Sequence, residues 1–202
     1  LDGETTNPSY AARVIRTAPD AQDIARGAPG ALVGVLNQFV NLTELHTQGV
    51  DLDLRWRLWK GDWGTYTLSS TNSYLHKYKT QVVREDPLTE YAGTYGLPRL
   101  RSIHSLLWDR GPWAATVAWN HVDDYDASTS APPGAAKVGN WDTYDLQVSY
   151  TGFKNLKLTV GGRNILDRDP PIDLSSGTVP YDFSQHNPRG AYWYGLVSYR
   201  FK

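Results

Sequence analysis

The segment GVDLDLRWRLWKGDWGTYTLSSTNSYL, residues 49–75, carries the clearest folding signal in the chain. Its first part alternates apolar residues with mostly charged ones: Val50, Leu52, Leu54, Trp56 and Leu58 against Asp51, Asp53, Arg55, Arg57 and Trp59. A period of two is typical of a strand with one apolar and one polar face, and a helix does not produce it. The KGDWG turn then leads into a second alternating run that begins at Tyr66 and Leu68. The segment therefore predicts a β-hairpin.

The hairpin pattern recurs along the rest of the chain. Short turns join the strands of a hairpin, and long polar segments separate successive hairpins. The further predicted strands are residues 99–108, 113–122, 143–150, 156–164 and 192–201, and the long loops are residues 80–97, 124–142 and 165–190. Residues 31–48 are predicted to extend the first strand, and residues 1 to about 30 to be irregular. The sequence thus predicts about seven antiparallel strands and almost no helix.

The composition excludes several classes of function. The chain contains no Cys, which rules out disulfides, thiolate metal sites and Cys nucleophiles. A formal net charge of -1 gives no support to binding of nucleic acid. No run approaches the roughly 18 apolar residues of a membrane helix, which excludes helical spans only.

Two architectures fit this alternation. A soluble sandwich points its apolar residues into a dry core, whereas a membrane barrel points them at lipid and keeps a polar interior. The barrel is favoured because short turns alternate with long loops, polar residues recur on one face, and aromatic residues flank the turns. These aromatic residues are Trp59, Trp63, Trp108, Trp113, Tyr150 and Phe153. His104 falls in the apolar file of its strand, and one β-bulge would restore the phase.

Motifs of enzymes and metal sites are nearly absent. There is no Gly-rich phosphate loop, no HExxH and no nucleophile elbow. Asp124, Asp126 and Ser128 have the spacing of a calcium loop, but the Gly and the Glu that such a loop needs are missing, so a solvated acidic loop is the better interpretation. The five His residues show no ligand spacing. We therefore expect no enzyme, no cofactor and no metal site.

Several segments resemble a known family. TQGVDLDLRWRL, PRLRSIHSLLWDRGPWAATVAWNHV, VGNWDTYDLQVSYTG, NLKLTVGGRNILDRDPP and NPRGAYWYGLVSYRF are similar to the C-terminal part of TonB-dependent receptors. These are plugged β-barrels of the Gram-negative outer membrane. The resemblance covers about residues 30–202 and implies an all-β, antiparallel transmembrane β-barrel. This chain would supply about the last seven of about 22 strands around a plug.

The resemblance also implies a domain organisation and partners. Residues 1–202 would be the C-terminal part of one barrel domain, with an extracellular loop at 1–35, strands and loops at 36–202, and the plug outside this chain. Because an open sheet edge leaves unpaired amides in lipid, we expect the plug and the remaining strands as a second chain of the same cleaved protein. Further expected partners are the TonB complex, the barrel-assembly machinery, lipopolysaccharide, phospholipid and a small-molecule substrate.

Three groups of residues are candidates for function. Aromatic side chains in the long loops offer rigid contact area for a ligand, and the candidates are Tyr91, Tyr95, Tyr125, Trp141, Tyr181, Phe183 and His186. The lumen-facing charges Asp51, Asp53, Arg55 and Arg57 would either pair with the plug or line an ion-conducting wall. The lipid-facing residues Trp193, Val197, Tyr199 and Phe201 would close the barrel and, by the resemblance, carry its assembly signal.

The function that the resemblance implies is TonB-dependent active import of a scarce solute, such as a siderophore or another nutrient, across the outer membrane. Two alternatives come from other classes of protein. One is a passive porin or translocator barrel, and the other is a soluble carbohydrate-binding β-sandwich. The sequence leaves the identity of the solute open.

Overall fold

The computed structural model describes residues 11–36, 44–81, 87–94, 96–127, 137–173 and 179–201. The chain divides into two compact units, one within residues 1–45 and 80–88 and one within residues 46–79 and 89–202. No helix in the described part of the chain has the length and apolar character needed to cross a membrane.

The smaller unit holds a short hairpin with a helix between its strands. Its elements are β1 (Val14–Arg16), α3 (Ala21–Arg26) and β2 (Leu32–Val35), with β1 and β2 antiparallel. The Asp20 carboxylate accepts hydrogen bonds from the backbone of Gln22 and Asp23, each at 2.8 Å, and Gly27 ends the helix at φ 63°. Such a capping box starts a helix from local sequence alone. The sequence predicted irregular backbone up to about residue 30, and this helix signal was missed. The predicted extension of the first long strand over residues 31–48 is wrong for residues 32–35, which form β2 and pair with β1 instead.

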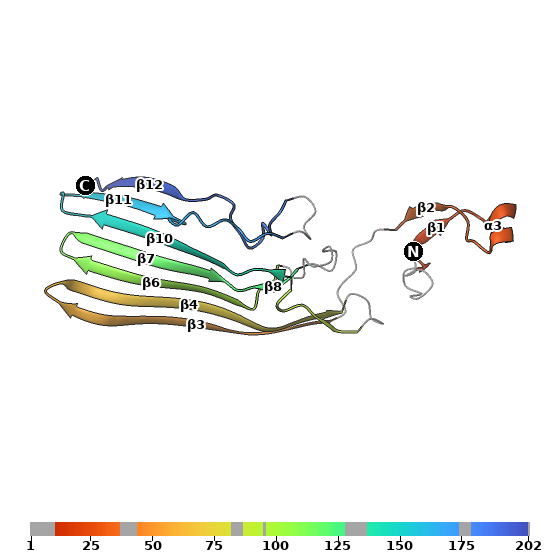
Figure 1. Cartoon of the computed structure of the whole chain (residues 1–202), viewed down its shortest axis with the longest axis horizontal. Coiled ribbons are helices and arrows are strands. Elements are labelled where there is room, and N and C mark those ends of the chain that lie inside the picture. Colours follow the sequence, from red (N-terminus) through yellow and green to blue (C-terminus); the bar gives the residue numbers. More distant parts are fainter. Residues whose placement is uncertain are drawn as a thin grey trace. The chain divides into compact units, whose positions relative to one another are not determined.

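The larger unit is built on one sheet. Its strands are β3 (Glu44–Gly61), β4 (Gly64–Gln81), β5 (Thr89–Glu90), β6 (Leu100–Arg110), β7 (Trp113–Val122), β10 (Trp141–Tyr150), β11 (Leu156–Arg163) and β12 (Tyr192–Tyr199). Their order is β12-β11-β10-β7-β6-β4-β3, with β5 also paired to β4, so neighbours in the sheet follow one another along the chain (Figure 1). The pairs from β4 to β12 are antiparallel. The predicted all-β, antiparallel fold is confirmed.

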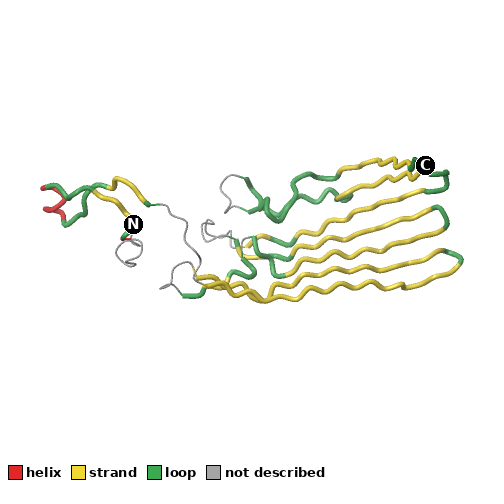
Figure 2. The backbone as a smooth tube through the Cα atoms, turned by 180° about the vertical axis from the view of Figure 1, so that it is seen from behind, coloured by secondary structure: helices red, strands yellow, loops and turns green. Residues whose placement is uncertain are grey.

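The short turns and the long connections lie at opposite ends of this sheet. The turns β3–β4, β6–β7 and β10–β11 share one end, on the right in Figure 2. Gly64 (φ 107°) and Gly111 (φ 56°) stand in two of these turns, in a backbone region that residues with a Cβ rarely adopt. The longer connections, with the small pair β8 (Tyr125–Asp126) and β9 (Lys137–Val138), lie at the other end, which we call the loop end.

The two faces of the sheet differ in chemistry. Directly paired residues of an antiparallel sheet share a face, so the register assigns whole rows of side chains. One row runs Leu68, Leu106, Val117, Leu146, and the next row on the other face runs Thr67, Leu107, Thr116, Gln147. We call these the apolar face and the polar face. Their separation is the pattern of a membrane barrel, with apolar residues outside and polar residues inside.

The sheet has no dry core. Large apolar side chains such as Val117, Val160 and Val197 are exposed, and the buried apolar residues Ala92, Val122, Tyr125 and Val138 lie toward the loop end. No helix occurs among the described residues of this unit. A soluble sandwich would instead bury its apolar rows between two sheets, and this arrangement therefore argues against that alternative.

His104 does lie on the apolar face, and the bulge predicted to correct its phase is absent. The β4–β6 and β6–β7 registers run without a break from Leu100 to Arg110. Ser70 Oγ and His104 Nδ1 are 2.9 Å apart, and the His104 ring stacks on Trp119 at a centroid distance of 4.9 Å. The side chain keeps its place because neighbouring strands provide a polar and an aromatic partner.

The terminal strand β12 is one edge of the sheet, and β3 is the other. β12 pairs with β11 from Tyr199 opposite Leu156 to Tyr192 opposite Arg163. Trp193, Val197, Tyr199 and Phe201 are exposed. Among the described residues, neither edge has a second partner, so the sheet is open.

Candidate functional site at the loop end

The loop of residues 179–190 is anchored by a buried carboxylate. Asp182 is fully buried, and its Oδ2 accepts a hydrogen bond from the Tyr125 hydroxyl at 2.8 Å. Its Oδ1 accepts from the backbone N–H and the hydroxyl of Ser184, at 2.8 and 2.6 Å. Because a buried carboxylate needs such donors to offset its lost hydration, Asp182 fixes the loop to strand β8.

His186 packs inside the same cluster. Its ring lies parallel to Tyr125, with centroids 6.2 Å apart, and meets Trp141 edge-on at 5.4 Å. Nδ1 lies 3.1 Å from the carbonyl oxygen of Asp182, so Nδ1 carries the proton that is donated there. Burial lowers the pKa of His186 below its ordinary value of 6.5, although the charge of Asp182 opposes the shift. The neutral imidazole is thus the form that the packing favours.

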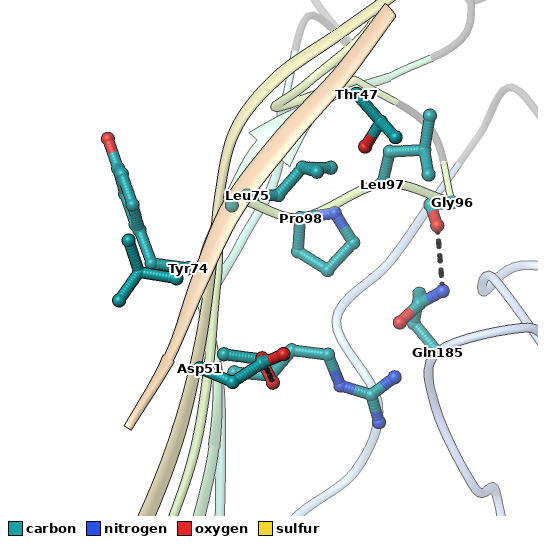
Figure 3. A pocket seen from close by; sticks show the side chains of 12 residues that line it. Thr47, Asp51, Tyr74, Leu75, Gly96, Leu97, Pro98 and Gln185 are labelled. Atoms are coloured by element: carbon teal, nitrogen blue, oxygen red, sulfur yellow. Dashed lines mark hydrogen bonds between the residues drawn. The ribbon is translucent and has the colours of Figure 1, made fainter.

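The loop also reaches the polar face of the sheet. The Gln185 amide donates to the carbonyl of Gly96 at 2.9 Å (Figure 3). A pocket of about 430 Å³ lies between this contact and strands β3 and β4. In Figure 3, Asp51 and Thr47 point into the pocket, whereas Tyr74 points away on the other side of the sheet. Asp51 therefore lies on the polar face and accepts a hydrogen bond from Ser73 at 2.6 Å.

Two more pockets continue along the polar face. A pocket of about 360 Å³ shares Arg101 and Gln185 with the first, and a third of about 190 Å³ shares Asn120 and Trp141 with the second. The third pocket adds Arg163 and Arg189. We call the six residues Arg101, Asn120, Trp141, Arg163, Gln185 and Arg189 the polar belt. The belt crosses the sheet from β6 to β11 at the loop end.

The acidic groups beside the belt already have hydrogen-bond partners. Asp145 accepts from the Asn120 amide at 3.2 Å and from the Asn164 backbone at 2.9 Å. Arg101, Arg163 and Arg189 form no ion pair among the described residues, and Arg189 instead lies over the Tyr192 ring at 5.2 Å. The belt consequently offers guanidinium groups whose charge is not neutralised by a neighbouring carboxylate.

The structure brings together three of the predicted ligand contacts and separates the others. His186 makes ring contacts with both Tyr125 and Trp141, but Tyr125 and His186 are buried. Phe183 is exposed, and Tyr181 is half-buried. Tyr91 is exposed, and its backbone N–H donates to the carbonyl oxygen of Tyr78 at 2.7 Å. Tyr95 lies outside the described residues.

The predicted lumen-facing charges beyond Asp51 are exposed. Asp53, Arg55 and Arg57 follow Asp51 at alternate positions of β3, and none has an ion pair in the described part of the chain. In the acidic loop, Asp124 pairs with Lys137 at 2.8 Å, and Ser128 lies outside the described residues. No group of three His, Cys, Asp or Glu residues within the described ranges could hold a metal ion.

Sequence reasoning missed most of the belt. It selected aromatic residues in the long loops, Trp141 among them, and overlooked Arg101, Asn120, Arg163, Gln185 and Arg189. A usable signal existed, because Arg101, Asn120 and Arg163 occupy polar-face positions at the strand ends next to the long loops. Gln185 could not have been found this way, since its position depends on how the loop folds back.

The architecture is that of a membrane-barrel wall. It combines an apolar outer face, a polar inner face, turns at one end and loops folded onto the polar face at the other. The family described as TonB dependent receptor-like, beta-barrel matches residues 8–165, which is most of the chain, and the chain belongs to this family.

A solved structure shows the same fold. It is described as "Copper transporter OprC", and it matches with a TM-score of 0.52 and 17% sequence identity. The match covers 76% of this chain and 23% of that chain, so the chain spans about a quarter of the length of this neighbour. The comparison with curated proteins found no match.

Proposed function

We propose that this chain forms part of the wall of a TonB-dependent importer in the bacterial outer membrane. In this proposal, the loop end faces the outside, the turns face the periplasm, and the polar belt contacts the entering solute. The observation that carries the proposal is the polar belt itself, since three adjoining pockets line the polar face directly under loop 179–190. Membership of the receptor family supports it. The protein transports and does not catalyse.

The proposal assigns a contact surface of the chain to each of the other expected partners. The exposed charges Asp53, Arg55 and Arg57 contact a plug domain, because guanidinium and carboxylate groups at a buried interface need partners of opposite charge. The open edges pair with further barrel strands of the same protein, carried on a second chain if the protein is cleaved. TonB acts through the plug, the assembly machinery reads the terminal strand, and lipopolysaccharide and phospholipid cover the apolar face.

A permeability measurement tests the proposal. We expect liposomes that contain the full receptor to exclude a small sugar such as arabinose, because the plug fills the lumen, while a general porin as control admits it. In cells, we expect the receptor to accumulate at least one solute from a panel of metal chelates and sugars, and only when TonB is present. Free passage of arabinose would support the porin alternative. Accumulation that does not depend on TonB would overturn active import.

A further inference from the structure

We propose that the polar belt recognises an organic anion that carries more than one carboxylate. This inference rests on the proposed function and names the class of solute. It starts from Arg101, Arg163 and Arg189, which have no ion-pair partner in the described part of the chain. A planar guanidinium binds a carboxylate through two parallel hydrogen bonds, which makes arginine suited to such a solute.

The three arginines occupy different elements and are held at the belt. Arg101 stands on β6 between Ser73 of β4 and Val122 of β7. Arg163 is the last residue of β11, opposite Tyr192, and Arg189 lies over the ring of the same tyrosine. A cation above an aromatic ring is stabilised without losing its hydrogen-bond donors. The Arg189 guanidinium therefore keeps its donors for a ligand.

The nearby acids do not compete for these arginines. Asp145 is bonded to Asn120 and Asn164, Asp51 to Ser73, and Asp182 lies buried under Tyr125. Each carboxylate thus has neutral donors of its own. His186 packs as a neutral ring and adds no charge at neutral pH. Among the residues that line the three pockets, three arginines stand against Asp51 and Asp145, so the formal charge of the Arg, Lys, Asp and Glu side chains in the lining is +1.

One buried donor beside the arginines points to a ligand that carries acceptors. Trp141 Nε1 is buried and has no hydrogen-bond partner among the described residues, although Trp141 lines two of the three pockets. An indole N–H can only donate. It therefore calls for an acceptor, which a carboxylate oxygen would supply together with the arginines. Gln185 Oε1, the other buried belt atom without a partner among the described residues, is an acceptor and calls for a donor on the ligand.

The spacing of the arginines favours several anionic groups. β6 and β11 are separated by three strand intervals, and the register sets Arg163 in the row of Ser105, four residues along β6 from Arg101. Together these offsets place the backbones of Arg101 and Arg163 roughly 20 Å apart. Long side chains shorten this gap, but one carboxylate cannot satisfy both guanidinium groups and Trp141. A rigid molecule with carboxylates around a ring meets these requirements and can also stack on an aromatic side chain.

Calorimetric titration of the full receptor in detergent tests the inference. The probe is benzene-1,3,5-tricarboxylate, and the matched neutral control is benzene-1,3,5-trimethanol. We expect saturable binding of the tricarboxylate and none of the triol. Arg101→Gln and Arg163→Gln should each weaken binding roughly tenfold or more, because each removes charge-assisted hydrogen bonds. Lys157→Gln removes a charge from the same face near the turns and should leave binding unchanged.

The possible outcomes are decisive. The inference is overturned if the tricarboxylate fails to bind, if the triol binds equally well, or if the arginine variants bind like the wild type. Heat-modifiable migration shows that each variant is folded. Failure of the proposed function is seen separately, since open liposomes or accumulation without TonB would reject import while leaving the binding of the tricarboxylate intact.

Discussion

The Asp182 carboxylate shows how one residue can organise a loop. It accepts hydrogen bonds from Tyr125 and Ser184 while fully buried, and these donors replace the hydration that the carboxylate loses. Removing one donor leaves a buried acceptor undersatisfied, which costs about 1–3 kcal/mol. The position of Gln185, and with it part of the polar belt, depends on this anchor.

We expect Tyr125→Phe to loosen loop 179–190. The substitution removes the hydroxyl that donates to Asp182 and keeps the ring that packs on His186. Hydrogen exchange measured by mass spectrometry should show faster exchange in residues 179–190 and unchanged protection in β6 and β7. Phe183→Leu, at an exposed position of the same loop, serves as the control. Equal protection in Tyr125→Phe and wild type would contradict the anchoring role.

We expect His186 to make the packing of this loop dependent on pH. Its pKa is lowered in the folded loop, chiefly by burial, while Asp182 and Asp173 oppose the shift and Arg101 supports it. The opened loop binds the proton more readily than the packed loop. Stability is therefore complete above about pH 6.5, the ordinary His value, and is lost as the pH falls from there toward the lower pKa of the packed loop.

The corresponding measurement is hydrogen exchange of residues 179–190 at pH 7.5 and pH 5.5, corrected for the intrinsic pH dependence of exchange. We expect protection to fall at the lower pH in the wild type. His186→Gln cannot take up a proton in this range, and its protection should be the same at both values. A wild-type loop that stays equally protected at pH 5.5 would show that His186 does not titrate in this range.

At the scale of the elements, the tight turns constrain the hairpins. A Cβ at Gly64 would lie 2.5 Å from the carbonyl oxygen of Asp109 and 2.8 Å from Trp108 Nε1, and the φ angle of Gly64 is 107°. Gly111 also has a positive φ, but a Cβ there would meet nothing within 4 Å. Comparing an alanine substitution at Gly64 with one at Gly111 therefore separates the effect of backbone strain from the effect of a steric clash.

We expect Gly64→Ala to reduce the yield of folded barrel more strongly than Gly111→Ala. The first substitution combines strain with a collision against the neighbouring strand, and the second adds strain alone. The folded fraction is read from the heat-modifiable band of outer-membrane preparations. Similar yields for the two variants would mean that the clash at Gly64 is relieved by a small movement of the turn.

Much of the sheet could be predicted from the sequence because its signals are local. The alternation in residues 49–75 and the short turns predict the hairpins directly, and the ends of β6 and β7 agree with the predicted segments to within two residues. The site could be predicted only in part. Tyr125, Trp141 and His186 meet through a loop that folds back, and no period in the sequence specifies such a contact.

The alternation also misled at one point. A strictly apolar row would exclude His104, and a β-bulge is the local change that would move His104 to the other face. The structure keeps the register and satisfies His104 with Ser70 from the neighbouring strand, 34 residues away in the chain. Cross-strand hydrogen bonds of this kind depend on which strands become neighbours and in which register, so they are visible only once the sheet is known.

At the scale of the whole molecule, the two open edges of the sheet require further strands to pair with. β12 presents unpaired backbone groups on its outer side among the described residues, and its outer file ends at the exposed Phe201. We expect Phe201→Asp to reduce the amount of folded barrel in the outer membrane, since a charge replaces an aromatic side chain at the rim. The heat-modifiable band measures this amount.

Phe183→Asp is the matched control for this prediction, because it places the same charge at another exposed phenylalanine, in a loop. We expect its yield to equal that of the wild type. If Phe201→Asp assembles as well as Phe183→Asp, the terminal aromatic residue has no special part in assembly. If both variants fail, the defect comes from the added charge in general.

On the apolar face, the row of side chains around His104 contains polar groups, and this has a consequence for the bilayer. The row that contains Ser70, His104 and Trp119 lies six residues above Trp113, which is roughly 20 Å along the strand and about 15 Å along the membrane normal at a barrel tilt. The lipid-facing band of such barrels is about 25 Å tall. On this side, the hydrophobic thickness of the wall is therefore short, and the surrounding membrane must thin or let headgroups descend to meet it.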